Sequence, residues 1–269
     1  MTKKTYDLST EFMIAERDGA VGIMTFNNPA SHNAVKLEMW EAIPEILDYF
    51  EDDSEIRVIV LRGAGEKAFI SGADISEFEQ NRSSPQAVKR YEDAADGAMA
   101  RLATAKRPTI CAIRGYCIGG GLGIALACDM RIATDNSRFG VPAAKLGVGY
   151  RLAGLRKLVD VVGPSFAKEI FFTARQFDAE EAREMGLINR VTGIDELETF
   201  VGTYCDTIAV NAPITIDSVK RIIGEIIKGE GDADAVLCER LVQDCFASAD
   251  YEEGRTAFME KRKPVFKGR

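Results

Sequence analysis

The chain has 269 residues, 46% of them hydrophobic and 28% charged, a composition that fits a folded globular protein and excludes a disordered or fibrous one. Its formal net charge of −8 leaves no broad basic face for nucleic-acid phosphates or an anionic membrane, so we expect neither as a partner. The length fits one α/β unit with a helical appendage.

The first half of the chain alternates short strands with helices. Residues 12–16 and 21–26 flank an Asp18-Gly19 turn signal and predict a β-hairpin. A helix follows, because apolar residues recur at intervals of three and four from Trp40 to Phe50. The apolar run 58–61 predicts a strand buried on both faces. A helix, a strand, a second helix and a second strand are then predicted at residues 85–105, 109–113, 122–127 and 130–133. This alternation predicts a parallel sheet covered by helices.

Helical signals dominate beyond Leu152. The predicted helices cover residues 155–162, 164–173 and 178–186, and the last opens with a capping-box pair. Two apolar stripes, which start at Ile216 and Leu237, predict further helices with a break at Glu230-Gly231-Asp232. These helices either cover their apolar faces with partner subunits, which we expect, or fold back on their own sheet.

The cysteines and the N-terminal sequence indicate the cellular compartment that we expect for the protein. The six cysteines form no C-x-x-C pair, so we expect reduced, buried thiols and neither a disulfide scaffold nor a metal site. No apolar stretch of signal-peptide length follows the first lysines, and no segment approaches about 18 uninterrupted apolar residues. These features predict a cytoplasmic protein.

The chain contains a single histidine, His32, in a polar loop. A Ser-His-Asp or Cys-His site would have to use it. Nothing around it in the sequence points to that role, so we do not expect histidine-based nucleophilic catalysis.

Two glycine-marked segments each follow a buried apolar run: Ser71-Gly72-Ala73-Asp74-Ile75 and Gly115-Tyr116-Cys117-Ile118-Gly119-Gly120-Gly121. Glycine lets another backbone or a ligand approach closely. A helix that starts near Gly121 leaves its first amides unpaired, with the positive end of the helix dipole facing outward. Such a turn receives an anion without a charged side chain.

The spacing of the glycines distinguishes between the kinds of anion site that such turns can form. A phosphate loop needs Lys followed by Ser or Thr after the glycines, and none follows. A dinucleotide fingerprint needs a third glycine where the chain has Ile124. Two interpretations remain. In one, two backbone amides from the two loops converge on one developing oxyanion. In the other, the glycines only allow tight packing and have no catalytic role.

Several motifs together carry a resemblance to a known family. They are Asn27-Asn28-Pro29-Ala30-Ser31-His32-Asn33-Ala34, the two glycine segments, Ala127-Cys128-Asp129, and residues 139–147 and 182–191. From residue 12 to residue 266 the chain resembles the enoyl-CoA hydratase/isomerase, or crotonase, superfamily. The resemblance implies an α/β fold, a crotonase (ClpP-like) spiral of ββα units over residues 1–200. It also implies that residues 201–269 form a C-terminal helical region used in homotrimer or hexamer assembly.

The same resemblance implies a chemistry. The substrate would be an acyl-CoA thioester, with no cofactor beyond its coenzyme A, and the backbone amides of Ala73 and Gly120 would form the oxyanion hole for a thioester enolate. Removing a proton or a carboxylate beside a thioester leaves negative charge on its carbonyl oxygen. Each fixed amide donor aimed at that oxygen is worth roughly 10²–10³ in rate.

Two positions depart from the family pattern. Hydratases that this chain resembles carry glutamates where it has Gly123 and Ala143, and the one-glutamate isomerases also use the position of Ala143. Neither residue transfers a proton. Because each positioned acid or base contributes about 10²–10⁴, we expect hydration by the usual route to be largely lost.

The stretch from Leu146 to Leu155 resembles the corresponding part of methylmalonyl-CoA decarboxylase, which has a tyrosine at the position of Tyr150 but keeps a glutamate at that of Gly123. Decarboxylation needs no general base, only an oriented carboxylate, an apolar pocket and a proton donor for the enolate. Tyr150 would orient the carboxylate or supply the proton, and Arg151 would pair with an acid group. Both can also be ordinary structural residues.

The resemblance also implies contacts with coenzyme A. Ser31 and His32 match the loop that wraps the pantetheine and adenine, although Ala30 replaces a basic residue often found there. Phe258 and Lys261 match a pair that the family offers to the nucleotide from an adjacent subunit. We therefore expect an acyl-CoA lyase that decarboxylates a methylmalonyl-type thioester or hydrates an enoyl-CoA by an atypical route. The alternative is a catalytically silent acyl-CoA-binding protein of the same fold.

Overall fold

The structure is a computed structural model that describes residues 3–74, 84–229 and 231–269. Over these residues seven strands form the larger sheet, in the order β1-β2-β3-β4-β6-β8-β11. Their bounds are β1 (Lys3–Tyr6), β2 (Met13–Asp18), β3 (Val21–Phe26), β4 (Val58–Gly63), β6 (Thr109–Ile113), β8 (Met130–Thr134) and β11 (Arg190–Thr192). The pairs β1–β2 and β2–β3 are antiparallel, and every later pair is parallel. The predicted hairpin, the buried strand after it and the parallel sheet are confirmed.

A second, four-stranded sheet within the described ranges has the order β10-β9-β7-β5. Its strands are β5 (Ala68–Ile70), β7 (Tyr116–Ile118), β9 (Arg138–Gly140) and β10 (Phe177–Asp178). The periodicity of the sequence does not predict this sheet, because two or three residues are too few to show an alternating pattern. It matters for function because β5 and β7 each end in one of the glycine segments.

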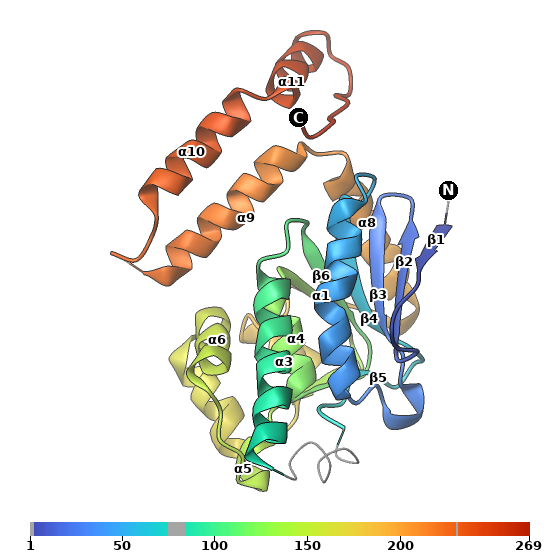
Figure 1. The fold of residues 1–269 in the computed structure, drawn as a ribbon, viewed down its shortest axis with the longest axis vertical. Coiled ribbons are helices and arrows are strands. Elements are labelled where there is room, and N and C mark those ends of the chain that lie inside the picture. The colour runs from blue at the N-terminus through green and yellow to red at the C-terminus, as the bar shows by residue number, and fades with distance from the viewer. Residues whose placement is uncertain (1–2, 75–83, 230) are drawn as a thin grey trace.

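Helices cover both faces of the larger sheet (Figure 1). On one face lie α1 (Leu37–Asp52), α3 (Pro85–Ala103) and α4 (Gly120–Ala127). The apolar stripe predicted from Trp40 to Phe50 is buried there, in the main hydrophobic core. On the other face α8 (Leu197–Ala209) packs Leu197, Val201 and Cys205 against strand residues such as Val60. The expected domain boundary at residue 200 therefore falls inside a helix that belongs to the sheet's own packing.

Further helical elements complete this part of the chain. They are η1 (Pro29–Ser31), α5 (Ala143–Leu146), α6 (Leu152–Thr173), α7 (Ala179–Glu184) and η3 (Ile194–Glu196). Gly163, with φ 73°, kinks α6 at the point where the sequence predicts one helix to end and another to begin. The capping box at the start of α7 is confirmed, because the Asp178 carboxylate accepts a bond from the Glu181 amide and the Glu181 carboxylate accepts one from the Asp178 amide.

Three helices, α9 (Pro213–Lys228), α10 (Ala235–Phe246) and α11 (Ala249–Met259), extend away from the sheets (Figure 1). The predicted break lies between the first two, although Glu230 itself is outside the described residues. Several of their large apolar side chains are exposed: Val219, Ile223, Ile226, Ile227, Val236, Val242 and Phe246. These side chains do not fold back on the chain's own sheets.

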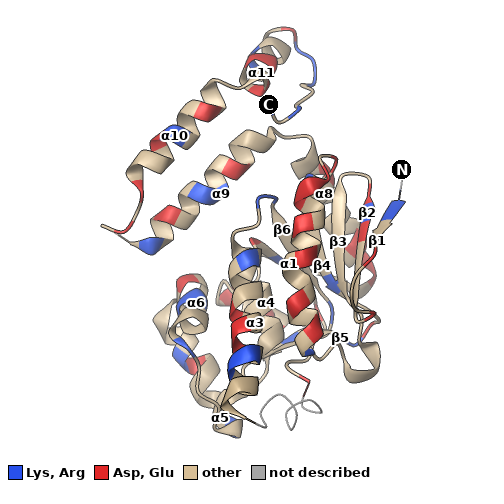
Figure 2. Ribbon diagram, in the orientation of Figure 1, with Lys and Arg blue, Asp and Glu red and all other residues tan. Residues whose placement is uncertain are grey.

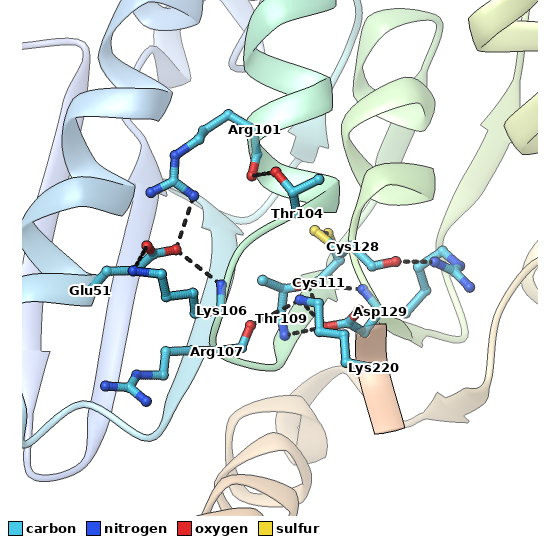
Figure 3. A network of polar contacts seen from close by, with 11 residues as sticks. Glu51, Arg101, Thr104, Lys106, Arg107, Thr109, Cys111, Cys128, Asp129 and Lys220 are labelled. Carbon is cyan, nitrogen blue, oxygen red and sulfur yellow. Dashed lines mark hydrogen bonds and ion pairs between the residues drawn. The ribbon is translucent and has the colours of Figure 1, made fainter. Parts of the chain in front are cut away.

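One polar network fastens α9 to the rest of the molecule (Figure 3). The Lys220 ammonium donates to the Asp129 carboxylate at 2.8 Å and to the Arg107 carbonyl at 3.0 Å. Asp129 also accepts hydrogen bonds from the amide and hydroxyl of Thr109 at the start of β6. Side-chain contacts to charged groups of this kind hold the C-terminal helices to the sheet.

The surface carries charges of both signs (Figure 2), with acidic residues along the exposed side of α1. Arg101 of α3 pairs with Asp48 and Glu51 of α1. All six cysteines are free, and Cys111, Cys117, Cys128 and Cys205 are buried as expected, whereas Cys238 and Cys245 are partly buried. Of the helices that the structure describes, none combines the length and apolar character needed to cross a bilayer.

Candidate active site

Two glycine turns lie side by side at the end of the smaller sheet. β5 and β7 are parallel neighbours, so both carboxyl ends reach the same edge. A Cβ atom placed on Gly119, after β7, would lie 3.9 Å from the Cα of Gly72, after β5. Both residues have positive φ, 122° for Gly72 and 55° for Gly119, a conformation that glycine adopts without strain. The turns therefore bring the residues that follow them, Ala73 and Gly120, into one neighbourhood.

The backbone around Ala73 is held by pairing with Val35. The Val35 amide donates to the Gly72 carbonyl at 2.8 Å, and the Asp74 amide donates to the Val35 carbonyl at 3.0 Å. In a parallel bridge of this kind the N–H of the central residue, Ala73, points away from its partner strand. The last residue of the motif, Ile75, lies outside the described residues.

Gly120 is the first residue of α4, and Gly119 caps that helix. The first amides of a helix have no partner within it, and the helix dipole makes this end positive. Within residues 3–74, 84–229 and 231–269 the backbone N–H groups of Ala73 and Gly120 donate no hydrogen bond. A Cβ atom on the next residue, Gly121, would lie 2.5 Å from the Ile70 carbonyl oxygen, which shows how tightly α4 seats on β5.

Side chains from α1 and α3 form a wall beside these amides. A Cβ atom at Gly120 would lie 3.4 Å from Cζ2 of the Trp40 indole. The indole N–H of Trp40 donates to the Tyr91 hydroxyl at 3.0 Å, and that hydroxyl donates to the Val35 carbonyl at 3.4 Å. The wall thus links α1 and α3 to the residue that pairs with Ala73.

Gly123, on the next turn of α4, lies beside the sulfur of Met99, at the position where the resemblance implies a glutamate. A Cβ atom on Gly123 would lie 3.1 Å from the Met99 Sδ of α3. Ala143, the other departure from the pattern, is buried at the start of α5. Neither position carries an acid or a base, and the thioether of Met99 occupies the space beside Gly123.

Tyr150 lies between α5 and α6. Its ring packs edge-on against Phe171, with 4.7 Å between ring centroids, and 39% of the residue is exposed. Burial of the hydroxyl raises the pKa of Tyr150 above its ordinary value, so that the neutral, proton-bearing form is favoured. Its ring contacts are with α6, and Arg151 links its segment to α3 through ion pairs with Glu92 and Asp96.

Ser31 and His32 lie at the surface, in the loop that follows β3. The Ser71 amide donates to the His32 carbonyl at 3.1 Å, and the Ser71 hydroxyl donates to the Ser31 carbonyl at 3.3 Å. Because Ser71 lies two residues before Ala73, the structure brings this predicted coenzyme A loop next to the predicted oxyanion site.

Buried Asn33 holds the same loop in place, a role that the sequence analysis missed. Its side-chain amide donates to the Ala64 carbonyl at 2.9 Å and to the Ala68 carbonyl at 2.8 Å, and its side-chain oxygen accepts from the Asn28 amide at 3.0 Å. The signal available was the Asn-rich motif itself, since asparagine tolerates the positive φ of 56° found here. The wall residues Tyr91 and Met99 carried no local signal.

Phe258 and Lys261 lie apart from the other predicted site residues. Both are exposed, on and just after α11, and Figure 1 places α11 at the opposite end of the molecule from β5. The chain's own fold does not bring them to the glycine turns. Their expected contact with the nucleotide, made from an adjacent subunit, stays a prediction. In the part of the chain that the structure describes, no three His, Cys, Asp or Glu side chains are grouped so as to hold a metal ion.

Comparison with known proteins identifies the family. A family model described as enoyl-CoA hydratase/isomerase matches residues 16–269. The chain belongs to the enoyl-CoA hydratase/isomerase family. It is 34% identical to a short-chain-enoyl-CoA hydratase of Clostridium acetobutylicum, covering 93% of this chain and 95% of that protein. It is 32% identical to a crotonyl-CoA hydratase of Syntrophomonas wolfei, covering 96% and 99%.

Solved structures agree with this assignment. An enoyl-CoA hydratase/carnithine racemase from Magnetospirillum magneticum superimposes with a TM-score of 0.90 at 34% identity, covering 97% of each chain. The predicted crotonase fold of the α/β class is thereby confirmed. For a member of the enoyl-CoA hydratase/isomerase family, the amides of Ala73 and Gly120, which donate to no described residue, are the feature from which a chemistry can be argued.

Proposed function

We propose that the protein is a lyase that acts on acyl-CoA thioesters through an enolate whose oxygen accepts hydrogen bonds from the backbone amides of Ala73 and Gly120. The observation that carries this proposal is that two neighbouring glycine turns present backbone N–H groups that donate no hydrogen bond to any described residue. Fixed donors of this kind stabilise charge that develops in the transition state without having to reorganise.

The reaction that we favour is decarboxylation of a methylmalonyl-type thioester. The bond between the α carbon and the carboxylate breaks, carbon dioxide leaves, and the electron pair moves into the enolate. Tyr150 then donates its hydroxyl proton to the α carbon, which gives a propionyl thioester. An apolar pocket favours the loss of carbon dioxide, because the charged carboxylate leaves as a neutral molecule.

The surroundings of Gly123 support decarboxylation over hydration. Hydration needs a group that activates water and a group that protonates carbon. Gly123 faces the Met99 thioether, and Ala143 is buried with no ionisable group of its own. Hydration by an atypical acid or base stays the second candidate, because the relatives named above are hydratases.

The test is turnover by the pure, full-length protein. Methylmalonyl-CoA and crotonyl-CoA are supplied separately, and release of carbon dioxide and loss of enoyl absorbance are followed. Binding is followed independently by the fluorescence of Trp40, the single tryptophan, which lies beside Gly120. The proposal predicts carbon dioxide release from methylmalonyl-CoA.

Each other outcome contradicts a stated part of the proposal. Loss of crotonyl-CoA absorbance without carbon dioxide release assigns atypical hydration instead. Binding of both thioesters without turnover of either assigns the catalytically silent acyl-CoA-binding alternative. In every case coenzyme A belongs to the substrate, and no other cofactor is proposed.

Assembly is a further part of the proposal. The exposed apolar side chains of α9 and α10 support a homotrimer, or a hexamer built from two trimers, in the cytoplasm. In such an assembly Phe258 and Lys261 would reach the coenzyme A of an adjacent subunit. Light scattering on the purified protein measures the subunit number, and a monomer at assay concentration would contradict this part.

A further inference from the structure

The segment that carries Tyr150 has few backbone restraints. It runs from Gly147, whose φ is 66°, to Arg151, which caps α6. The Val148 amide donates to the Ala143 carbonyl at its start, and the Leu155 amide donates to the Arg151 carbonyl at its end. A Cβ atom on Gly149 would meet nothing within 4 Å. Side-chain contacts therefore contribute much of what holds Tyr150 in place.

Arg151 makes two of these contacts. Its guanidinium donates to the Asp96 carboxylate at 2.9 Å and also to the Glu92 carboxylate. Both acids lie on α3, one helical turn apart, so that the two arms of a planar guanidinium reach both at once. The charge of Glu92 and the hydrogen bond that Arg151 donates to Asp96 raise the pKa of Arg151 above its ordinary value, so both contacts are made by a permanently charged group.

The partner helix is the one that lines the candidate active site. One residue before Glu92, Tyr91 bonds the Trp40 indole beside Gly120. Three residues after Asp96, Met99 lies against Gly123. A clasp between Arg151 and α3 therefore sets the position of the Tyr150 segment relative to the wall of the oxyanion site.

We propose that Arg151, clasped by Glu92 and Asp96, is a positioning residue that fixes Tyr150 for proton transfer to the enolate. This inference rests on the proposed function, because it needs Tyr150 to act on the substrate. Arg151 acts through Tyr150 and not on the substrate itself, since two carboxylates of the chain already take up its guanidinium. The sequence predicts an acid partner for Arg151, and in the structure Glu92 and Asp96 are its partners.

The experiment compares Tyr150→Phe, Arg151→Met and the double variant in the full-length protein with methylmalonyl-CoA. Loss of a positioned proton donor costs roughly 10²–10⁴ in rate, so we expect Tyr150→Phe to lower kcat by at least about 100-fold. We expect Arg151→Met, which keeps the Tyr150 hydroxyl, to lower kcat by at least about ten-fold, a smaller loss than that of Tyr150→Phe. The dissociation constant measured by Trp40 fluorescence should be unchanged. Because Arg151 acts through Tyr150, the double variant should be no slower than Tyr150→Phe alone.

A matched control lies on the same helix. Asp93 neighbours Glu92, but its salt bridge is with Lys89, also of α3. Asp93→Asn should keep wild-type kcat, whereas Glu92→Gln combined with Asp96→Asn should behave like Arg151→Met. Hydrogen exchange gives a readout independent of turnover: amides of residues 147–151 should exchange faster in Arg151→Met and as in the wild type in Asp93→Asn.

The outcomes separate this inference from the proposed function. Wild-type kcat in Tyr150→Phe overturns the proposed role of Tyr150 and this inference with it. A slow Tyr150→Phe beside a wild-type Arg151→Met, a double variant slower than Tyr150→Phe, or unchanged exchange at residues 147–151 overturns the positioning role alone.

Discussion

Gly120 offers a way to remove one backbone donor from the candidate oxyanion hole without disturbing the fold. It is the first residue of α4, and a helix tolerates proline best at this position because the amide there has no partner within the helix. Gly120 donates no hydrogen bond to another described residue, so Gly120→Pro breaks none of them. The residue before it is Gly119, at φ 55° and ψ −114°, and glycine accepts the restriction that a following proline imposes.

Gly120→Ala is the matched control. Both substitutions add a Cβ atom 3.4 Å from the Trp40 ring, an ordinary contact, but only proline removes the N–H. In a helix interior alanine is favoured over glycine by about 1 kcal/mol, and Gly120 is only the first residue of its helix. The free energy of unfolding of Gly120→Ala should therefore change by less than about 1 kcal/mol. Loss of one oxyanion donor costs roughly 10²–10³ in kcat, or about 2.7–4 kcal/mol of transition-state stabilisation.

The assay measures carbon dioxide release from methylmalonyl-CoA at saturating substrate, beside urea unfolding of each variant. We expect Gly120→Ala within a few-fold of the wild type and Gly120→Pro slower by at least about 100-fold, with both variants folded. Equal rates for the two folded variants would refute the reasoning, because the N–H is the intended difference between them.

Four further outcomes follow from the same geometry. Gly121→Ala should lower the free energy of unfolding by about 1–3 kcal/mol or more, since its Cβ would lie 2.5 Å from a backbone carbonyl oxygen; a urea midpoint equal to that of Gly120→Ala would contradict this. Asn33→Ala should cost about 2–4 kcal/mol in urea unfolding, because it orphans buried partners at a positive φ of 56°; a change under about 1 kcal/mol would show that these bonds matter little. Burial raises the pKa of Tyr150, so its hydroxyl stays protonated as the pH rises, and initial rates should hold to about pH 10 and fall only above it; a decline centred near pH 8 would exclude Tyr150 as the donor. Gly123→Glu should raise crotonyl-CoA hydration at least about ten-fold from its baseline, since only a flexible thioether must move by a few tenths of an ångström; no gain in a folded variant would mean that the carboxylate does not reach the substrate.

The parts of the fold that show in the sequence are those with long, regular patterns. The continuous apolar run at β4 and the three-and-four spacing along α1 each span enough residues to establish a period, and both elements are present as predicted. The capping box of α7 is equally local, because its two members lie three residues apart. The smaller sheet was missed because strands such as β5 are three residues long.

The candidate site also has parts that the sequence predicts and parts that it does not. Glycine spacing and family resemblance together pointed to Ala73 and Gly120, because the turns that present them are encoded locally. The contact of Met99 with Gly123 joins residues of two helices that meet only in the folded chain, and no local pattern predicts it. The same holds for the clasp on Arg151, whose partners lie more than fifty residues away.

The central claim is that the oxygen of a thioester sits between two backbone nitrogens. A crystal structure of the full-length protein with a bound, unreactive acyl-CoA analogue measures this directly. The account predicts the thioester oxygen about 2.7–3.1 Å from the nitrogen of Ala73 and from that of Gly120. An ordered thioester whose oxygen is hydrogen-bonded to neither nitrogen would contradict it.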